Sequence, residues 1–161
     1  MLAVASQAGL CLLEFVGQKG VERELAQVEA ARGSLAQSGD SPILAQTQAE
    51  LAEYFAGQRE QFAVPLDLVG TAFQMAAWQA LLAIPHGQTR SYAQQACAIG
   101  QPSATRAVAA ANGANKVSII VPCHRFIGSN GSLTGFGGGL ARKEALLALE
   151  GRAAQQDLHG F

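Results

Sequence analysis

The sequence predicts an α/β N-terminal domain, with a small sheet and helices, over residues 1–69, and a mostly α-helical C-terminal domain with a helix-turn-helix over residues 70–161. A chain of 161 residues has room for one domain or two small ones. Alternating apolar residues mark the first half, whereas apolar residues at helical spacing mark the second. Charge also divides the chain, because residues 1–70 hold 4 Lys and Arg against 9 Asp and Glu, and residues 71–161 hold 7 against 3.

The composition excludes several classes of protein. Hydrophobic residues make up 49% of the chain and charged residues 14%, so global disorder is excluded. No apolar run reaches the ~18 residues that span a bilayer, and the N-terminus lacks the pattern of a signal peptide. We therefore expect a cytoplasmic protein without a membrane partner. The basic second half suits a polyanionic partner, although so small a charge difference also arises by chance.

The N-terminal domain is expected to begin with a β-hairpin, because apolar residues alternate loosely on both sides of a loop at Gly9. Ser41 as N-cap and Pro42 at the first helical position announce a helix that ends at Gly57. The expected elements are a hairpin over residues 2–16, helices over residues 21–31 and 42–57, and a returning strand over residues 62–68.

The C-terminal domain is expected to be mainly helical, and Pro85 and Gly151 each follow an apolar helical stripe. The expected elements are helices over residues 71–84, 91–99 and 103–112, a short strand over residues 117–121, a last helix over residues 140–150, and a loose tail over residues 152–161.

The two short helices are separated by Gly100-Gln101-Pro102, which gives the outline of a helix-turn-helix. An ordinary helical hairpin has the same outline. The second helix has almost no bulky side chain besides Arg106 and Val108, so a DNA groove could approach its backbone closely. An alanine-rich helix buried against its neighbours is the alternative interpretation.

A possible nucleophile, Cys123, stands next to His124. A thiol becomes nucleophilic as its thiolate, which a neighbouring base or cation stabilises. Because adjacent residues of an extended segment point to opposite sides, we expect a water molecule to link the imidazole and the sulfur.

A third group should orient the ring of His124, and only three carboxylates follow Asp67 in the chain. Glu150 stands in the C-terminal turn of the last helix, where the helix dipole disfavours an anion. Arg142 and Lys143 stand in its first turn, where the dipole disfavours cations. These exceptions favour Glu150 as the partner of His124 and the two basic residues as contacts to an anion outside the protein. Alternatively, each end effect costs under ~1 kcal/mol and needs no explanation.

The three cysteines are too few for a disulfide framework, and without a Cys-x-x-Cys pair we expect no metal and no cofactor. Cys11 and Cys97 stand on apolar faces and are expected to be core residues.

Residues 135–139 hold four glycines but no G-x-G-x-x-G fingerprint. Such a backbone could approach a flat ligand closely, or it could be a flexible hinge.

The run Pro122-Cys-His-Arg125, with Asn115 eight residues before the cysteine and Gly138-Gly-Leu140 and Glu150 after it, resembles the O6-alkylguanine-DNA alkyltransferase family. The resemblance covers residues 70–151, about half of the chain. Further matches, in order, are Phe73, Trp78-Gln79, Ile84-Pro85, Ser91-Tyr92, Arg106-Ala-Val108 and Ala111-Asn112. The resemblance implies a ribonuclease H-like N-terminal domain and a winged-helix-like alkyltransferase domain.

The resemblance also implies a function. The protein would bind double-stranded DNA that contains O6-alkylguanine, flip the damaged nucleotide out of the duplex, and move its alkyl group irreversibly to Cys123, with O4-alkylthymine as a second substrate. His124, through water, would remove the thiol proton, and Glu150 would orient His124. Asn115 would be the hinge that fixes the turn before the cysteine. Tyr92 would crowd the phosphate and protonate the departing guanine.

Further residues are implied to contact DNA and the flipped base. Arg106 would fill the gap left by the base, and small residues of its helix would admit the minor groove. The implied DNA contacts are Thr105, Arg106, Ala107, Ala109 and Arg125. The backbone at Phe126 and Gly137 would line the base pocket, whereas Phe136 replaces a tyrosine often found there, so a role that rests on its hydroxyl is lost. We expect a monomer.

Two other functions compete with alkyl transfer. The first is a non-catalytic helix-turn-helix protein, either a lesion sensor or a transcription regulator. The sensors of the alkyltransferase-like class carry another residue where Cys123 stands. The second is a Cys-His hydrolase, which is disfavoured because the cysteine follows Pro122 at the end of a strand instead of opening a helix.

Overall fold

The computed structural model describes the backbone of residues 1–157 and the side chains as far as Gly151. It contains two compact units. The N-terminal unit consists of residues 1–70 together with residues 116–118, and the C-terminal unit begins at Thr71 and contains the other residues described. The predicted fold class is confirmed, because the first unit is α/β and the second is mostly helical. The sequence analysis placed residues 116–118 in the C-terminal domain, whereas in the structure they pair within the N-terminal unit.

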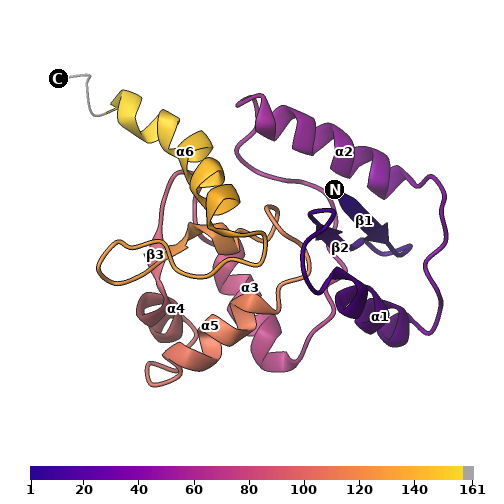
Figure 1. Cartoon of the computed structure of the whole chain (residues 1–161), viewed down its shortest axis with the longest axis horizontal. Coiled ribbons are helices and arrows are strands. Elements are labelled where there is room, and N and C mark those ends of the chain that lie inside the picture. The colour runs from indigo at the N-terminus through magenta and orange to yellow at the C-terminus, as the bar shows by residue number, and fades with distance from the viewer. Residues whose placement is uncertain (158–161) are drawn as a thin grey trace. The chain divides into compact units, whose positions relative to one another are not determined.

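The N-terminal unit is built around strand β2 (Leu10–Glu14), which is buried along its whole length. It pairs antiparallel with β1 (Leu2–Ala5), and helices α1 (Val21–Arg32) and α2 (Pro42–Phe55) flank this hairpin (Figure 1). Two extended segments add one parallel bridge each, Leu66 to Leu10 and Val117 to Leu13. The predicted strand over residues 62–68 is therefore reduced to a single bridge.

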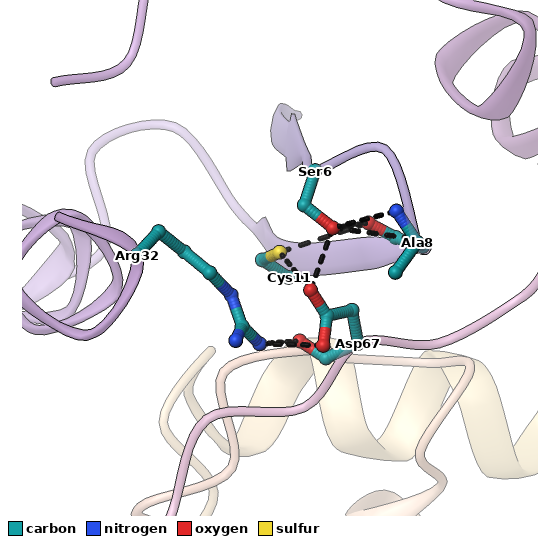
Figure 2. Close-up of polar contacts among 6 residues, drawn as sticks. Ser6, Ala8, Cys11, Arg32 and Asp67 are labelled. Atoms are coloured by element: carbon teal, nitrogen blue, oxygen red, sulfur yellow. Dashed lines mark hydrogen bonds and ion pairs between the residues drawn. The ribbon is translucent and has the colours of Figure 1, made fainter. Parts of the chain in front are cut away.

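Side-chain hydrogen bonds fix the turn of the hairpin and the segment beside it. Ser6 Oγ accepts a hydrogen bond from the Ala8 N–H at 3.0 Å and donates to Asp67 Oδ2 at 2.6 Å (Figure 2). Arg32 Nη2 lies 2.6 Å from Asp67 Oδ1 and thereby neutralises this carboxylate. Cys11 lies against the same carboxylate and is only 1% exposed. The prediction that Cys11 belongs to the core is confirmed.

Glu14 is a buried carboxyl group in the N-terminal unit, with 1% of its surface exposed. Ser118 Oγ donates a hydrogen bond to its Oε2 at 2.8 Å, whereas Oε1 has no partner among the residues that the structure describes. Burial raises the pKa of Glu14 from 4.5 to about 7, and the charge of Glu24 adds to the rise. The hydrogen bonds from Ser118 and Gln18 act in the opposite direction but do not cancel it.

We expect Glu14→Gln to stabilise the protein above pH 7 and to have little effect near pH 5. The folded protein holds a proton that the unfolded chain releases between pH 4.5 and about 7, so the free energy of unfolding falls across this window. An amide keeps the bond to Ser118 without this penalty, for a gain on the order of 2 kcal/mol at pH 8. Urea unfolding at pH 5 and pH 8 measures the difference, with exposed Glu60→Gln as the matched control. A gain of equal size at both pH values would contradict the expectation.

The C-terminal unit surrounds helix α3 with short helices. Its elements are α3 (Ala72–Leu82), β3 (Arg90–Ser91), α4 (Tyr92–Ala98), α5 (Thr105–Gly113), the 3-10 turn η1 (Cys123–Arg125), β4 (Phe126–Ile127) and α6 (Leu140–Asp157). Helices α3, α4 and α5 pack on one another, and β3 pairs parallel with β4.

Buried polar side chains lock the three packed helices together. The indole N–H of Trp78 on α3 donates to the Ala111 carbonyl oxygen on α5 at 2.9 Å. Gln95 on α4 and Asn112 on α5 exchange two hydrogen bonds, of 3.0 and 2.7 Å, and Gln95 also donates to the Ala77 carbonyl oxygen. Each bond satisfies a group that would be costly to bury alone, so the α4–α5 pair is held in one arrangement.

Four local predictions differ from the structure. The strand predicted over residues 117–121 is reduced to a single bridge at Val117, and residues 118–120 form a turn. Helix α6 continues through Gly151 to Asp157, so this glycine does not close the helix and residues 152–157 are not a loose tail. The part of the predicted tail beyond residue 157 lies outside the described residues. Cys97 is exposed on α4, where Gln95 and Ala96 are the buried residues. Helix α5 begins at Thr105, two residues later than the predicted start at residue 103.

Candidate active site

Cys123 begins the 3-10 turn η1, which replaces the extended segment predicted at this point. Its N–H donates to the Val121 carbonyl oxygen at 2.8 Å, and the N–H of Arg125 donates to the Pro122 carbonyl oxygen at 3.0 Å. The cysteine side chain is half-buried. A turn of three residues has little helix dipole, so neighbouring side chains are the main means of influencing the thiol.

Asn115 connects the end of α5 to this turn. Its Nδ2 donates to the Val121 carbonyl oxygen at 2.9 Å and to the Cys123 sulfur at 3.3 Å. The side chain is buried, so these bonds are shielded from water. The position that the resemblance assigned to a hinge therefore contacts both the turn and the sulfur.

His124 and Glu150 form a buried pair. Nε2 of His124 lies 2.8 Å from Oε1 of Glu150, and neither side chain is more than 1% exposed. The predicted contact between these two residues is present. Nδ1 of His124 is also buried and has no hydrogen-bond partner among the described residues.

Arg125 belongs to the same network and does not lie on the surface. Its Nε donates to Glu150 Oε2 at 2.8 Å, its Nη2 donates to Glu150 Oε1 at 3.0 Å, and its Nη1 donates to the Ile84 carbonyl oxygen at 2.5 Å. The prediction that Arg125 contacts DNA is therefore wrong, because the guanidinium group is buried and bonded within the protein.

The pKa of each member of this pair is lowered, but the causes differ. Burial alone would raise the pKa of Glu150, but hydrogen bonds from His124 and Arg125, together with their charges, hold it far below the usual range of a glutamate. Burial lowers the pKa of His124, and the charges of Arg125 and Lys143 add to this effect, whereas Glu150 opposes it. At neutral pH the site therefore holds an ionised carboxylate and a neutral imidazole.

Helix α6 brings Lys143 and Glu150 to η1 on one face. The two residues are seven apart, which is two helical turns, and the buried Leu146 lies between them. Lys143 is 0% exposed, and its Nζ donates to the Thr134 carbonyl oxygen at 2.8 Å. The prediction that Lys143 meets an anion outside the protein is therefore wrong. Arg142 is exposed and donates to the Gly138 carbonyl oxygen.

Tyr92 stands at the start of α4 and is half-buried. Its hydroxyl accepts a hydrogen bond from Thr134 Oγ1 at 3.2 Å. Its ring lies against the ring of Phe126, with centroids 5.4 Å apart. Because Phe126 is 1% exposed, its side chain supports Tyr92 from within the core. The implied role of the Phe126 backbone in a base pocket stays a prediction.

The glycine-rich segment over residues 135–139 precedes α6. Phe136 is half-buried, Gly137 is exposed, and Gly139 has a φ of 89°, a backbone conformation that side chains with a Cβ rarely adopt. The segment is thus a turn that leads into the helix carrying Lys143 and Glu150. The implied pocket roles of Phe136 and Gly137 stay predictions.

Helix α5 exposes the residues implied to contact DNA. Arg106 and Ala107 are exposed, and Thr105 and Ala109 are half-buried. Val108, Ala111 and Asn112 on the other side are buried. The alanine-rich helix therefore has both a packed face and a solvent-facing one, and the approach of a DNA groove to the exposed face stays a prediction.

Sequence reasoning missed the structural roles of Gln95 and Thr134. A glutamine in a short polar helix gives no sign that it forms hydrogen bonds with Asn112. A threonine in a loop gives no sign that its hydroxyl donates to Tyr92 while its carbonyl oxygen accepts from Lys143. Among the described residues, no cluster of three or more His, Cys, Asp or Glu side chains could hold a metal ion. No helix in the described part of the chain is long and apolar enough to cross a membrane.

Comparison with known proteins places this arrangement in a family. Two family models match the chain, "6-O-methylguanine DNA methyltransferase, ribonuclease-like domain" over residues 2–68 and "6-O-methylguanine DNA methyltransferase, DNA binding domain" over residues 72–152. The methylated-DNA–protein-cysteine methyltransferase of Mycobacterium tuberculosis strain H37Rv is 58% identical over 112 residues, which cover 70% of this chain and 68% of that protein.

Two further relatives cover nearly the whole chain. The methylated-DNA–protein-cysteine methyltransferase of Methanosarcina acetivorans is 42% identical over 152 residues, 94% of this chain and 91% of that protein. The crystal structure of Mycobacterium tuberculosis OGT in complex with DNA is similar with a TM-score of 0.79 and 43% identity, over 93% of this chain and 85% of that one. The chain therefore belongs to the 6-O-methylguanine DNA methyltransferase family.

Proposed function

We propose that the chain repairs DNA by moving the alkyl group from O6 of guanine, and from O4 of thymine, to the sulfur of Cys123. The observation that carries this proposal is the turn η1 in a chain of this family, where Cys123 accepts a hydrogen bond from Asn115 and the adjacent His124 is bonded to Glu150. It places a half-buried thiol beside an imidazole that a buried carboxylate holds. We further propose that the protein acts as a monomer on double-stranded DNA in the cytoplasm.

The first step is the removal of the thiol proton. Because Glu150 is ionised, Nε2 of His124 carries the hydrogen and donates it to Oε1, which leaves Nδ1 with its lone pair. Through a bridging water, Nδ1 takes the proton of Cys123. Glu150 stabilises the imidazolium that forms, and Asn115 donates a hydrogen bond to the thiolate.

The second step transfers the alkyl group. A lone pair of the Cys123 sulfur forms the S–C bond while the C–O6 bond breaks, and the electron pair of that bond goes to the guanine. The hydroxyl proton of Tyr92 passes to the departing base, and the tyrosine regains a proton from solvent. The thioether has no acyl carbon for water to attack, so the sulfur is not regenerated and each molecule acts once.

Helix α5 supplies the contact with DNA. Exposed Ala107 and half-buried Ala109 let the minor groove approach the helix, and the exposed Arg106 fills the space left by the flipped nucleotide. Thr105, the first residue of the helix, contacts the DNA beside Arg106. Contacts of this kind bind the backbone and the lesion without reading a particular sequence.

The test is transfer of a labelled methyl group from O6-methylguanine in duplex DNA. We expect label on the protein to stop at one equivalent per chain and to map by peptide analysis to Cys123. The exposed Cys97 is an internal control, because a thiol that reacts merely by being accessible would also be labelled. Turnover beyond one equivalent would contradict the proposal. Label that stays on DNA bound to the protein would favour a lesion sensor instead.

A further inference from the structure

The carboxylate of Glu150 is divided between two side chains of the turn η1. Its Oε1 accepts from His124 Nε2 at 2.8 Å and from Arg125 Nη2 at 3.0 Å. Its Oε2 accepts from Arg125 Nε at 2.8 Å and from the Gly87 N–H at 3.3 Å. Both oxygens therefore have bonds to Arg125, and only one of them faces the imidazole.

Arg125 is held too firmly to serve any partner outside the protein. Its third nitrogen, Nη1, is bonded to the Ile84 carbonyl oxygen, and the residue is 6% exposed. A planar guanidinium group matches a carboxylate through two parallel hydrogen bonds, which fixes the rotation of both groups. A lysine ammonium is a point charge and cannot fix the plane of the carboxylate in this way.

This division matters for the protonation of His124. A buried carboxylate bonded to the imidazole alone would favour the imidazolium, whose Nδ1 already carries a proton and cannot accept another. The charged groups that act on His124 are Glu150 and Lys143 from α6 and Arg125 from its own turn. The two cations oppose Glu150, and Arg125 is the one that also holds the carboxylate.

We propose that Arg125 is a positioning residue for alkyl transfer, which clamps Glu150 so that the carboxylate orients His124 through Nε2 while the imidazole stays neutral and keeps Nδ1 as a base. The inference rests on the proposed function for its catalytic consequence, but not for its effect on His124. It assigns the arginine of the Pro-Cys-His-Arg run to the interior of the site.

The test combines NMR titration of His124, with 15N-labelled histidine and without DNA, and single-turnover alkyl transfer over pH 5.5 to 9. In the unaltered protein at pH 7.5 we expect the neutral tautomer with hydrogen on Nε2. In Arg125→Met the titration midpoint should rise by about 1 pH unit, because one opposing charge is lost and Glu150 is left to the imidazole. The acid limb of the rate profile should move upward by the same amount, which lowers the rate by up to about tenfold at pH values below both midpoints.

Controls separate this role from a loss of stability. Arg125→Lys keeps the positive charge but loses the two parallel hydrogen bonds to the carboxylate. The titration midpoint of His124 should therefore shift less than in Arg125→Met, while alkyl transfer slows at every pH. Arg59→Met removes an arginine of the N-terminal unit and should change neither readout. Hydrogen on Nδ1 in the unaltered protein, which needs no variant to observe, would overturn the proposal. An unmoved titration midpoint and acid limb in a folded Arg125→Met would do the same. If the unaltered protein transfers no label, the proposed function fails. The titration of His124 still tests whether Arg125 holds Glu150 in the proposed way.

Discussion

Cys123→Ala is expected to abolish alkyl transfer and to leave the affinity for duplex DNA within about twofold. In the proposed function the Cys123 sulfur is the acceptor atom, and neither of the other two thiols is placed to substitute for it. Cys11 is buried in the N-terminal unit, and Cys97 is exposed without a bond to the His124 and Glu150 pair. The proposed DNA contacts lie on α5, and Asn115 keeps its bond to the Val121 carbonyl oxygen when the sulfur is gone.

Label transfer and fluorescence anisotropy with a labelled duplex measure the two effects separately. Cys97→Ala is the matched control, because it removes an exposed thiol from α4 and should change neither quantity. Alkyl transfer that persists in Cys123→Ala would mean that another residue accepts the alkyl group. A loss of DNA affinity as large as the loss of transfer would mean that the substitution disturbs the fold around η1.

Glu150→Gln is expected to slow alkyl transfer and to destabilise the protein strongly. The substitution leaves the buried guanidinium of Arg125 without its counter-charge, and removing one partner of a buried ion pair costs about 3–5 kcal/mol. For a chain of this size the melting temperature should fall by on the order of 10 °C. A residue that merely ended a helix against the dipole would give the opposite sign, a neutral or slightly stabilising change.

The loss of stability in Glu150→Gln is expected to be larger at neutral pH than at acidic pH. The pKa of Glu150 is lower in the folded protein than its usual 4.5, so the carboxylate stabilises the fold fully above that pH and loses the contribution as pH falls toward the folded value. The gap between the two proteins should therefore be widest at neutral pH and narrow below about pH 4. Thermal melts at several pH values measure it, with exposed Glu144→Gln on the same helix as the control. Equal melting temperatures at pH 7 would contradict the ion pair.

The sequence predicts the contact between His124 and Glu150 from the rule that a helix dipole disfavours an anion in the last turn. The contact is present in the structure, but the premise is wrong, because α6 continues beyond Glu150 to Asp157. The same rule leads to the wrong prediction for Lys143. It says that the dipole disfavours a cation in the first turn of a helix, but it does not say which group offsets this cost. The spacing of seven residues between Lys143 and Glu150 puts both on one helix face, and that signal would have turned the lysine inward.

Other predictions are wrong where the sequence does not show which side of an element is buried. The prediction that Cys97 is a core residue is wrong because α4 has no stripe of large apolar residues, and its buried side carries Gln95 and Ala96. A basic residue next to a reactive cysteine in a DNA-binding chain suggests a phosphate contact. That Arg125 instead turns inward depends on the Ile84 carbonyl oxygen and on Glu150, both distant in sequence.

The order of segments in the N-terminal unit constrains how the protein is made. Domains tend to fold in order as the chain leaves the ribosome. Leu13 gains its second backbone partner only from residues 116–118, because its N–H donates to the Lys116 carbonyl oxygen and its carbonyl oxygen accepts from Ser118. A nascent chain that has grown to Gly70 therefore exposes one edge of β2 and the unpaired carboxyl group of Glu14. The N-terminal unit, although made first, cannot be completed until residues 71–115, about half of the C-terminal unit, have been synthesised.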